Sequence, residues 1–147
     1  MDQTQPKPRF SEGFQVDPAT LAAGRYGTED MVSIWGPERT FEYSLLALGE
    51  AAMAIAELYP DIVSEEAAQE ILSKAYLEHV NPDRIRALEA ETGHDIIAIT
   101  TALEEQVADF AKPYVGLART SADTTETAKA LQIQKSLEVI ADTAENL

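Results

Sequence analysis

An apolar repeat in the last part of the sequence restricts the fold more than any other feature. From position 130 to the last residue, apolar side chains recur at alternating intervals of three and four: Ala130, Ile133, Leu137, Ile140, Ala144 and Leu147. This spacing is typical of a helix whose apolar stripe packs against long, nearly parallel neighbours. No glycine or proline interrupts the stripe. We therefore expect a helix of a long bundle that is cut within its length.

Helical spacing also dominates the sequence between Thr28 and this last helix. Five shorter helices are expected there, with start and stop signals at Thr28, Gly36-Pro37, Tyr59-Pro60, Ser64, Asn81-Pro82 and Gly93. The second of these helices runs to about Leu58, and the fifth runs from about Asp95 to Ala111 and buries Phe110. For the last helix we expect Asp123 as the N-cap, in an acidic variant of the capping box with Glu126.

The sequence contains no internal repeat and no convincing pair of strands, so we predict an all-α fold. Residues 1–24 contain three of the seven prolines and little periodicity, which indicates an extended or disordered arm. Residues 25–112 are expected to form an N-terminal helical domain, and residues 113–147 a connector followed by the truncated long helix.

Composition excludes several classes of function. The sequence has 26 acidic and 11 basic residues, a formal net charge of −15, which repels phosphate backbones and argues against a nucleic-acid partner. No apolar run is long enough to cross a membrane. Cysteine is absent, which excludes disulfides, a thiolate nucleophile and a Cys-type zinc site and is compatible with a cytoplasmic location.

Most catalytic motifs are also missing. The sequence has no glycine-rich phosphate loop, no Gly-x-Ser-x-Gly elbow, no His-Glu-x-x-His and no calcium loop, so we expect no metal and no cofactor. The two histidines are the only side chains that ordinarily titrate near neutral pH. His79 precedes Asn81-Pro82 at a helix end and is interpreted as structural. His94 follows Gly93 at a helix start, and taken alone it has the same structural interpretation.

Three short segments, in their order and spacing, change that interpretation. They are Arg25-Tyr26 followed by Met31-Val32-Ser33-Ile34-Trp35, then Glu91-Thr92-Gly93-His94-Asp95-Ile96-Ile97-Ala98, then Thr120-Ser121-Ala122-Asp123-Thr124-Thr125-Glu126-Thr127-Ala128. Together they resemble the N-terminal third of the adenylosuccinate lyases, in the fumarase/aspartase superfamily, and the likeness covers about residues 24–147. The resemblance implies the N-terminal helical domain and the start of the long central helical bundle of such a lyase.

The resemblance also implies a reaction. Members of this superfamily cleave a C–N or C–O bond by β-elimination and release fumarate, and adenylosuccinate lyases do so in purine nucleotide synthesis. A base removes the proton beside a carboxylate, donors stabilise the resulting aci-carboxylate, and an acid assists the leaving amine. The expected ligand is a small anionic dicarboxylate or a nucleotide.

The substrate-binding residues that the resemblance implies are Arg25, Tyr26, His94, Asp95, Thr120 and Ser121. The first two would hold the nucleotide phosphate, the next two would line the pocket, and the last two would bind a carboxylate with their hydroxyls and the amides of the long helix. The competing interpretations are structural. Arg25 would face solvent, Asp95 would be an N-cap, and Thr120 and Ser121 would only start the helix.

No catalytic residue is expected in this chain. The family's catalytic serine and second histidine lie in later parts of those enzymes, so the isolated chain is expected to be inactive. The family builds each active site from three subunits of a homotetramer, which implies self-association through the bundle helices.

The third segment departs from the family pattern Val-His-x-Gly-x-Thr-Ser-x-Asp. Gly116 stands at the histidine, Ala118 at the glycine and Arg119 at a small or apolar position, and Gly93 stands where many members have a basic residue. These changes leave room for a fumarate-releasing lyase of the argininosuccinate or carboxymuconate type, or for an inactive member. An alternative of another class is a helical interaction module that uses the apolar stripe.

Overall fold

The computed structural model describes residues 27–146, and all regular structure in this range is helical. The elements are α2 (Glu29–Trp35), α3 (Pro37–Leu58), α4 (Glu65–Lys74), α5 (Pro82–Thr92), α6 (Asp95–Glu104), the short 3-10 helix η1 (Lys112–Tyr114) and α7 (Ser121–Glu145). The prediction of an all-α fold is confirmed. The predicted arm at residues 1–24 lies outside the described residues.

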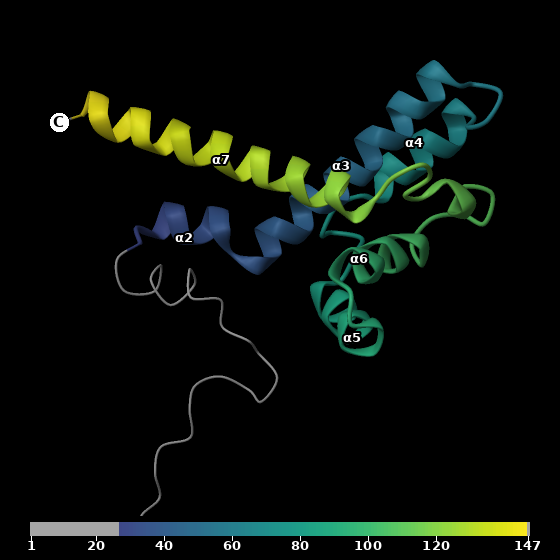
Figure 1. Cartoon of the computed structure of the whole chain (residues 1–147), viewed down its shortest axis with the longest axis horizontal. Helices are drawn as coiled ribbons and strands as arrows, with labels where there is room; N and C mark the ends of the chain where they lie inside the picture. Colours follow the sequence, from purple (N-terminus) through teal and green to yellow (C-terminus); the bar gives the residue numbers. More distant parts are fainter. Residues whose placement is uncertain (1–26, 147) are drawn as a thin grey trace, which may run out of the picture.

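The helices of the described residues form two packed pairs, α3 with α4 and α5 with α6, together with the short helices α2 and η1 and the long helix α7 (Figure 1). Helices α3 and α4 pack against each other, and α5 packs against α6. Helix α7 contacts α3, α6 and α2, and its second half runs beside α2 and beyond the hairpins (Figure 1). None of the helices within residues 27–146 combines the length and the apolar character needed to cross a membrane.

The predicted helix starts are confirmed by their caps. The side chains of Thr28, Ser64 and Asn81 accept hydrogen bonds from the backbone amides of Met31, Ala67 and Asp83, at 3.4, 3.2 and 2.9 Å. Pro37 occupies the first turn of α3 as expected. Gly93 ends α5 with φ +66°, the left-handed conformation that favours glycine after a helix.

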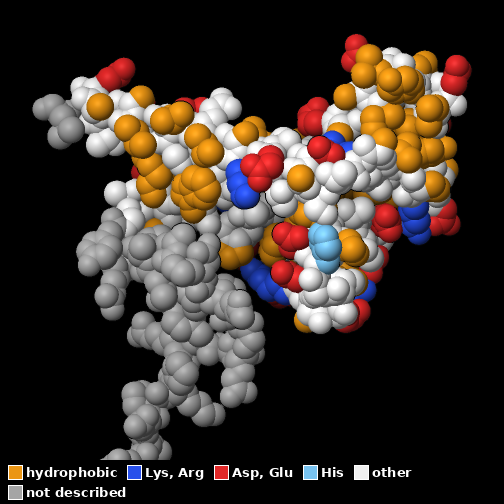
Figure 2. Space-filling view, viewed as in Figure 1, with side chains coloured by type: hydrophobic (Ala, Val, Ile, Leu, Met, Phe, Trp, Pro, Cys, Tyr) orange, Lys and Arg blue, Asp and Glu red, His pale blue; other side chains and the backbone are white. Residues whose placement is uncertain are grey.

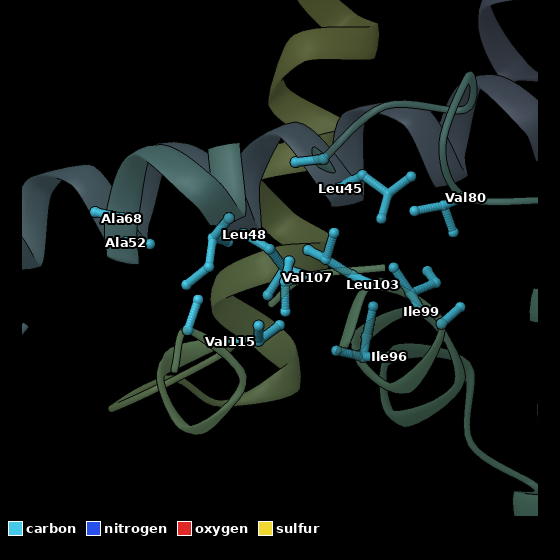
Figure 3. Close-up of a cluster of buried hydrophobic side chains, with 14 of the residues drawn as sticks. Leu45, Leu48, Ala52, Ala68, Val80, Ile96, Ile99, Leu103, Val107 and Val115 are labelled. Atoms are coloured by element: carbon cyan, nitrogen blue, oxygen red, sulfur yellow. The ribbon is translucent and has the colours of Figure 1, made fainter. Parts of the chain in front are cut away.

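The core lies where α3, α4, α5 and α6 converge. Its fully buried large side chains include Leu45 and Leu48 of α3, Ile71 of α4, Ile85 of α5, and Ile99 and Leu103 of α6. Figure 3 shows how several of these side chains meet. Complete burial of one such side chain stabilises the fold by about 1.5–3 kcal/mol. Leu58, the last residue of α3 and part of its three-and-four apolar spacing, is exposed.

A glycine permits the close packing of the α3–α4 hairpin. An added Cβ at Gly49 would lie 2.8 Å from Cδ1 of Leu72 and 3.1 Å from its Cα. Only a residue without a side chain therefore fits this point of helix contact.

The prediction for α6 was wrong at its C-terminal end. The helix stops at Glu104 rather than near Ala111, and Phe110, predicted to be buried, is half exposed. The physical reason is a tertiary contact: the backbone amide of Ala108 donates a hydrogen bond of 3.1 Å to the carboxylate of Glu70 on α4. The turns that follow Glu104 bring Val107 and Ala111 into the core.

Helix α7 presents an unexpected face to the rest of the chain. Its buried residues are small or polar: Thr124, Ala128, Gln132 and Ser136. The predicted apolar stripe faces outward, with Ile133, Leu137 and Ile140 exposed to 50%, 59% and 54%. Figure 2 shows hydrophobic side chains along this outer part of α7. The N-cap of the helix is Thr120, and Asp123, predicted to be the cap, is the third helical residue.

Candidate functional site

The N-termini of α6 and α7 meet at one place on the molecule. His94 is the N-cap of α6, and its Nδ1 accepts a hydrogen bond of 3.4 Å from the amide of Ile97. Its other ring nitrogen, Nε2, lies 3.2 Å from Oγ of Ser121, the first residue of α7. Two segments separated by 27 positions thereby contribute side chains to a single site.

The contacts of His94 fix what Ser121 can do. Because Nδ1 accepts from an amide, the neutral ring carries its proton on Nε2 and donates it to the serine oxygen. The hydroxyl hydrogen of Ser121 is then free to donate to a ligand. Asp95 Oδ1 lies 3.2 Å from Nδ1 and accepts from the amide of Ile96 at 2.7 Å.

Thr120 has a structural role in the start of α7. Its backbone amide donates a hydrogen bond of 2.8 Å to Oδ2 of Asp123, and its hydroxyl lies 3.3 Å from the same oxygen. The hydrogen bond from the Thr120 amide holds the pKa of Asp123 below its usual range. The structural interpretation thus fits Thr120 better than Ser121, whose hydroxyl faces a histidine from another helix.

A cavity of about 280 Å³ opens beside this junction, between α6, the connector and the first turn of α7. Leu48, Ile96 and Val115 form part of its apolar lining, and all three belong to the core cluster of Figure 3. The polar side chains that line it are Thr100, Thr101, Glu104, Arg119, Thr120, Ser121 and Thr124.

The shape of the connector depends on two left-handed residues. Gly116 has φ +71° and Ala118 has φ +56°. A Cβ at Gly116 would lie 3.3 Å from Cγ2 of Thr100, so this position of the cavity wall accommodates a side chain poorly. Ala118 adopts a conformation that glycine takes more easily, and the lyase pattern has glycine at this position.

The structure brings four of the six predicted site residues together: His94, Asp95, Thr120 and Ser121. The other two, Arg25 and Tyr26, lie outside the described residues. Asp95 is not the N-cap that the structural interpretation supposed, because His94 has that position. His79 is exposed in the connection between α4 and α5.

Sequence reasoning did not single out Glu104 or Thr124, although both line the cavity. Their spacing was a usable signal. Glu104 lies four residues after Thr100, and Thr124 lies four residues after Thr120, and residues four positions apart share one face of a helix. Within residues 27–146, no group of three or more His, Cys, Asp or Glu side chains is placed to hold a metal ion.

Comparison with known proteins finds similar relatives that include adenylosuccinate lyases of archaea. The chain is 37% identical over 123 residues to adenylosuccinate lyase of Methanocaldococcus jannaschii, covering 84% of this chain and 26% of that protein. It is 39% identical over 118 residues to the adenylosuccinate lyase of Methanothermobacter thermautotrophicus, covering 80% and 26%. For the Pyrococcus horikoshii adenylosuccinate lyase the identity is 40% over 116 residues, covering 79% and 25%.

The chain spans about a quarter of the length of these curated relatives. No protein-family model and no solved structure matches it.

Proposed function

The chain is homologous to adenylosuccinate lyases, and we propose that it forms part of a lyase that eliminates fumarate from adenylosuccinate or a similar substrate in purine nucleotide synthesis. The observation that carries this proposal is the contact between Ser121 and His94, at 3.2 Å, in a chain with these relatives. Residues 25–112 would be the N-terminal helical domain, and residues 113–147 the connector and first helix of the central bundle. The activity would be cytoplasmic, which fits a sequence without cysteine.

The proposed roles follow from hydrogen-bonding capacity. Ser121 would donate its hydroxyl hydrogen to a substrate carboxylate, assisted by the amides at the N-terminus of α7. His94 and Asp95 would line the same pocket, with the ring orienting the serine hydroxyl. Arg25 and Tyr26 would hold the nucleotide phosphate, the first by charge-assisted hydrogen bonds. We assign no catalytic acid or base within residues 27–146.

The apolar stripe of α7 suggests how the rest of the lyase is arranged. Ile133, Leu137 and Ile140 are half or more exposed, and they lie on one face of a helix of 25 residues. Exposed apolar surfaces of this kind usually mark interfaces. We propose that the stripe packs against bundle helices of further subunits in a homotetramer.

A chimaeric enzyme tests the proposed function. In it, this chain replaces the matching stretch of the Methanocaldococcus jannaschii adenylosuccinate lyase, and fumarate release from adenylosuccinate is measured. We expect turnover in an assembled chimaera and a clear loss in the matched Ser121→Ala chimaera. A chimaera that folds and assembles like the parent lyase but releases no fumarate would contradict the proposal.

Arg119 favours a second candidate within the same reaction class. It places a guanidinium in the cavity where the family pattern has a small or apolar residue. A fumarate-releasing lyase of the argininosuccinate or carboxymuconate type would use a different dicarboxylate. The same chimaera, assayed with argininosuccinate and with carboxymuconate-type substrates, distinguishes the two candidates by which substrate is consumed.

A further inference from the structure

Two polar groups in the wall of the cavity are buried without a hydrogen-bond partner. They are Nε of Arg119 and Oγ1 of Thr124, and neither has an acceptor or donor among the described residues. Thr124 is only 1% exposed, yet it lines the cavity together with Arg119. A buried donor without an acceptor destabilises the fold unless something else supplies the acceptor. An arginine N–H can only donate, so a group that satisfies it must carry an acceptor atom, such as a carboxylate or phosphate oxygen.

The positive charge of Arg119 is also unbalanced within residues 27–146. Arg119 forms no ion pair there: Asp123 is the carboxylate that attracts it, and that carboxylate accepts a hydrogen bond from the amide of Thr120. Burial lowers the pKa of Arg119, but a guanidinium remains charged in proteins. The cavity therefore holds a cation that is partly removed from water and forms no direct ion pair with a described carboxylate.

The first turn of α7 adds two further donors at the same place. The Thr120 amide is bonded to Asp123, and the Asp123 amide reaches the Thr120 carbonyl at 3.1 Å. The amides of Ser121 and Ala122 have no backbone partner in the described part of the chain. The positive end of a helix of 25 residues thus faces the region of Arg119 and Thr124.

We propose that this cavity is an oxyanion subsite that binds one carboxylate or phosphate group of a small ligand, with Arg119 as the cation and the Thr124 hydroxyl as a donor. Its volume of about 280 Å³ suits a ligand of a few heavy atoms rather than a whole nucleotide. The identity of the bound group is the one point that rests on the proposed function: in a fumarate-releasing lyase, the oxyanion in this cavity would be one carboxylate of the dicarboxylate substrate.

Glu104 sets the charge that the subsite accepts. It lines the same cavity, forms no ion pair within residues 27–146, and its burial raises the pKa of its carboxyl group. An ionised Glu104 opposes an incoming oxyanion, whereas a neutral side chain does not. Replacing it with glutamine should therefore strengthen anion binding, and a weaker affinity of the glutamine variant for the same anion would contradict this role of Glu104.

The test is a titration of the whole chain with fumarate and, separately, with inorganic phosphate, followed by calorimetry and by amide NMR shifts. We expect one saturable site for at least one of these anions. Arg119→Gln and Thr124→Val should each weaken it, the former by about tenfold or more because a charge-assisted hydrogen bond is lost. Glu104→Gln should tighten it several-fold. Arg84→Gln removes an exposed arginine paired with Glu105 and is the matched control, which should leave affinity unchanged.

Binding of fumarate alone identifies a carboxylate site, and competition between both anions identifies a general oxyanion site. Equal affinity in the Arg119→Gln and native chains, or an equal loss in Arg84→Gln, would overturn the inference. Arg119→Lys keeps the charge and should retain intermediate affinity, which guards against a glutamine variant that fails to fold.

The two proposals can fail independently. The chain could bind fumarate in a way that depends on Arg119 while the chimaeric enzyme shows no lyase activity. That result would contradict only the proposed function. An active chimaera in which Arg119→Gln leaves KM unchanged, together with a chain that binds neither anion, would contradict only the subsite.

Discussion

The side-chain amide of Gln132, on α7, donates a hydrogen bond of 2.8 Å to the backbone carbonyl of Ile34, on α2. The same nitrogen lies 3.1 Å from Oγ1 of Thr40 in the first turn of α3. Carbonyls in the last turn of a helix have no partner within that helix, so Gln132 supplies one from 98 positions away. One turn further along α7, the Ser136 hydroxyl oxygen accepts from the indole N–H of Trp35 at 2.9 Å. Polar side chains thus fix α2 to α7.

The first prediction concerns this contact. Replacing Gln132 with leucine should lower the free energy of unfolding by about 1–3 kcal/mol, because the Ile34 carbonyl would stay buried without its donor. Urea denaturation of the chain measures the change. Gln134→Leu, at an exposed position of the same helix, is the matched control and should alter stability little. Equal losses in both variants would contradict the capping role of Gln132.

A second prediction uses the left-handed conformation of Ala118, with φ +56°. The left-handed conformation destabilises an alanine by about 1–2 kcal/mol relative to the right-handed one. Glycine avoids this strain, but its greater loss of backbone entropy on folding opposes the gain by about 0.5–1 kcal/mol. Ala118→Gly should therefore stabilise the protein by about 0.5–1 kcal/mol. The control is Ala130→Gly, at an exposed interior position of α7, which should destabilise the protein by about 1 kcal/mol. Thermal unfolding of both variants checks the opposite signs.

The third prediction is a pH dependence. Hydrogen bonding to the Thr120 amide lowers the pKa of Asp123 below its usual 3.8, so the folded state favours the carboxylate. The resulting stabilisation is present above pH 3.8 and is lost as the pH falls through the lowered folded-state pKa. Asp123→Asn should therefore melt below the native chain at neutral pH, and the two melting temperatures should converge in acid. Asp142→Asn, in the exposed last turns of α7, should show no such convergence.

The fourth prediction concerns Ser121, whose hydroxyl faces His94. In the chimaeric lyase, Ser121→Ala should cost about 1–3 kcal/mol of transition-state stabilisation, because a donor to a charged group is lost. The measurements are kcat and KM of the folded enzyme, together with its melting temperature. A lower melting temperature with unchanged kinetics would mean that Ser121 only supports the start of α7.

Local chemistry explains which parts of the fold the sequence could predict. The caps at Thr28, Ser64 and Asn81 act on amides within three residues, so the pattern alone located those helix starts. The end of α6 could not be found this way, because it depends on a hydrogen bond from Ala108 to Glu70, 38 positions away. The α7 cap was misplaced because Thr120 and Asp123 are both good caps, and their mutual hydrogen bond decides between them.

The candidate site likewise combines features that the sequence could predict with features that depend on contacts between distant segments. Neither His94 nor Ser121 carries a signal for the other in the residues alone, and only the resemblance to lyases placed them in one pocket. Arg119 was recognised as a departure, but its burial depends on how the connector turns at Gly116. The cavity arises from three-dimensional packing of α6 against α7, which periodicity does not specify.

The last prediction follows from the exposed stripe of α7. Because Ile133 and Leu137 lie uncovered on a helix whose buried residues are small or polar, the chain should self-associate through this stripe. Sedimentation should give a mass that rises with concentration. The double variant Ile133→Gln, Leu137→Gln should be monomeric over the same range, since it replaces two exposed apolar side chains of the stripe with polar ones. The matched control, Lys129→Gln with Lys135→Gln, changes exposed charged side chains of the same helix and should associate like the native chain. A native chain that stays a monomer at every concentration, with sharp thermal unfolding and no binding of a hydrophobic dye, would show that the stripe needs no partner.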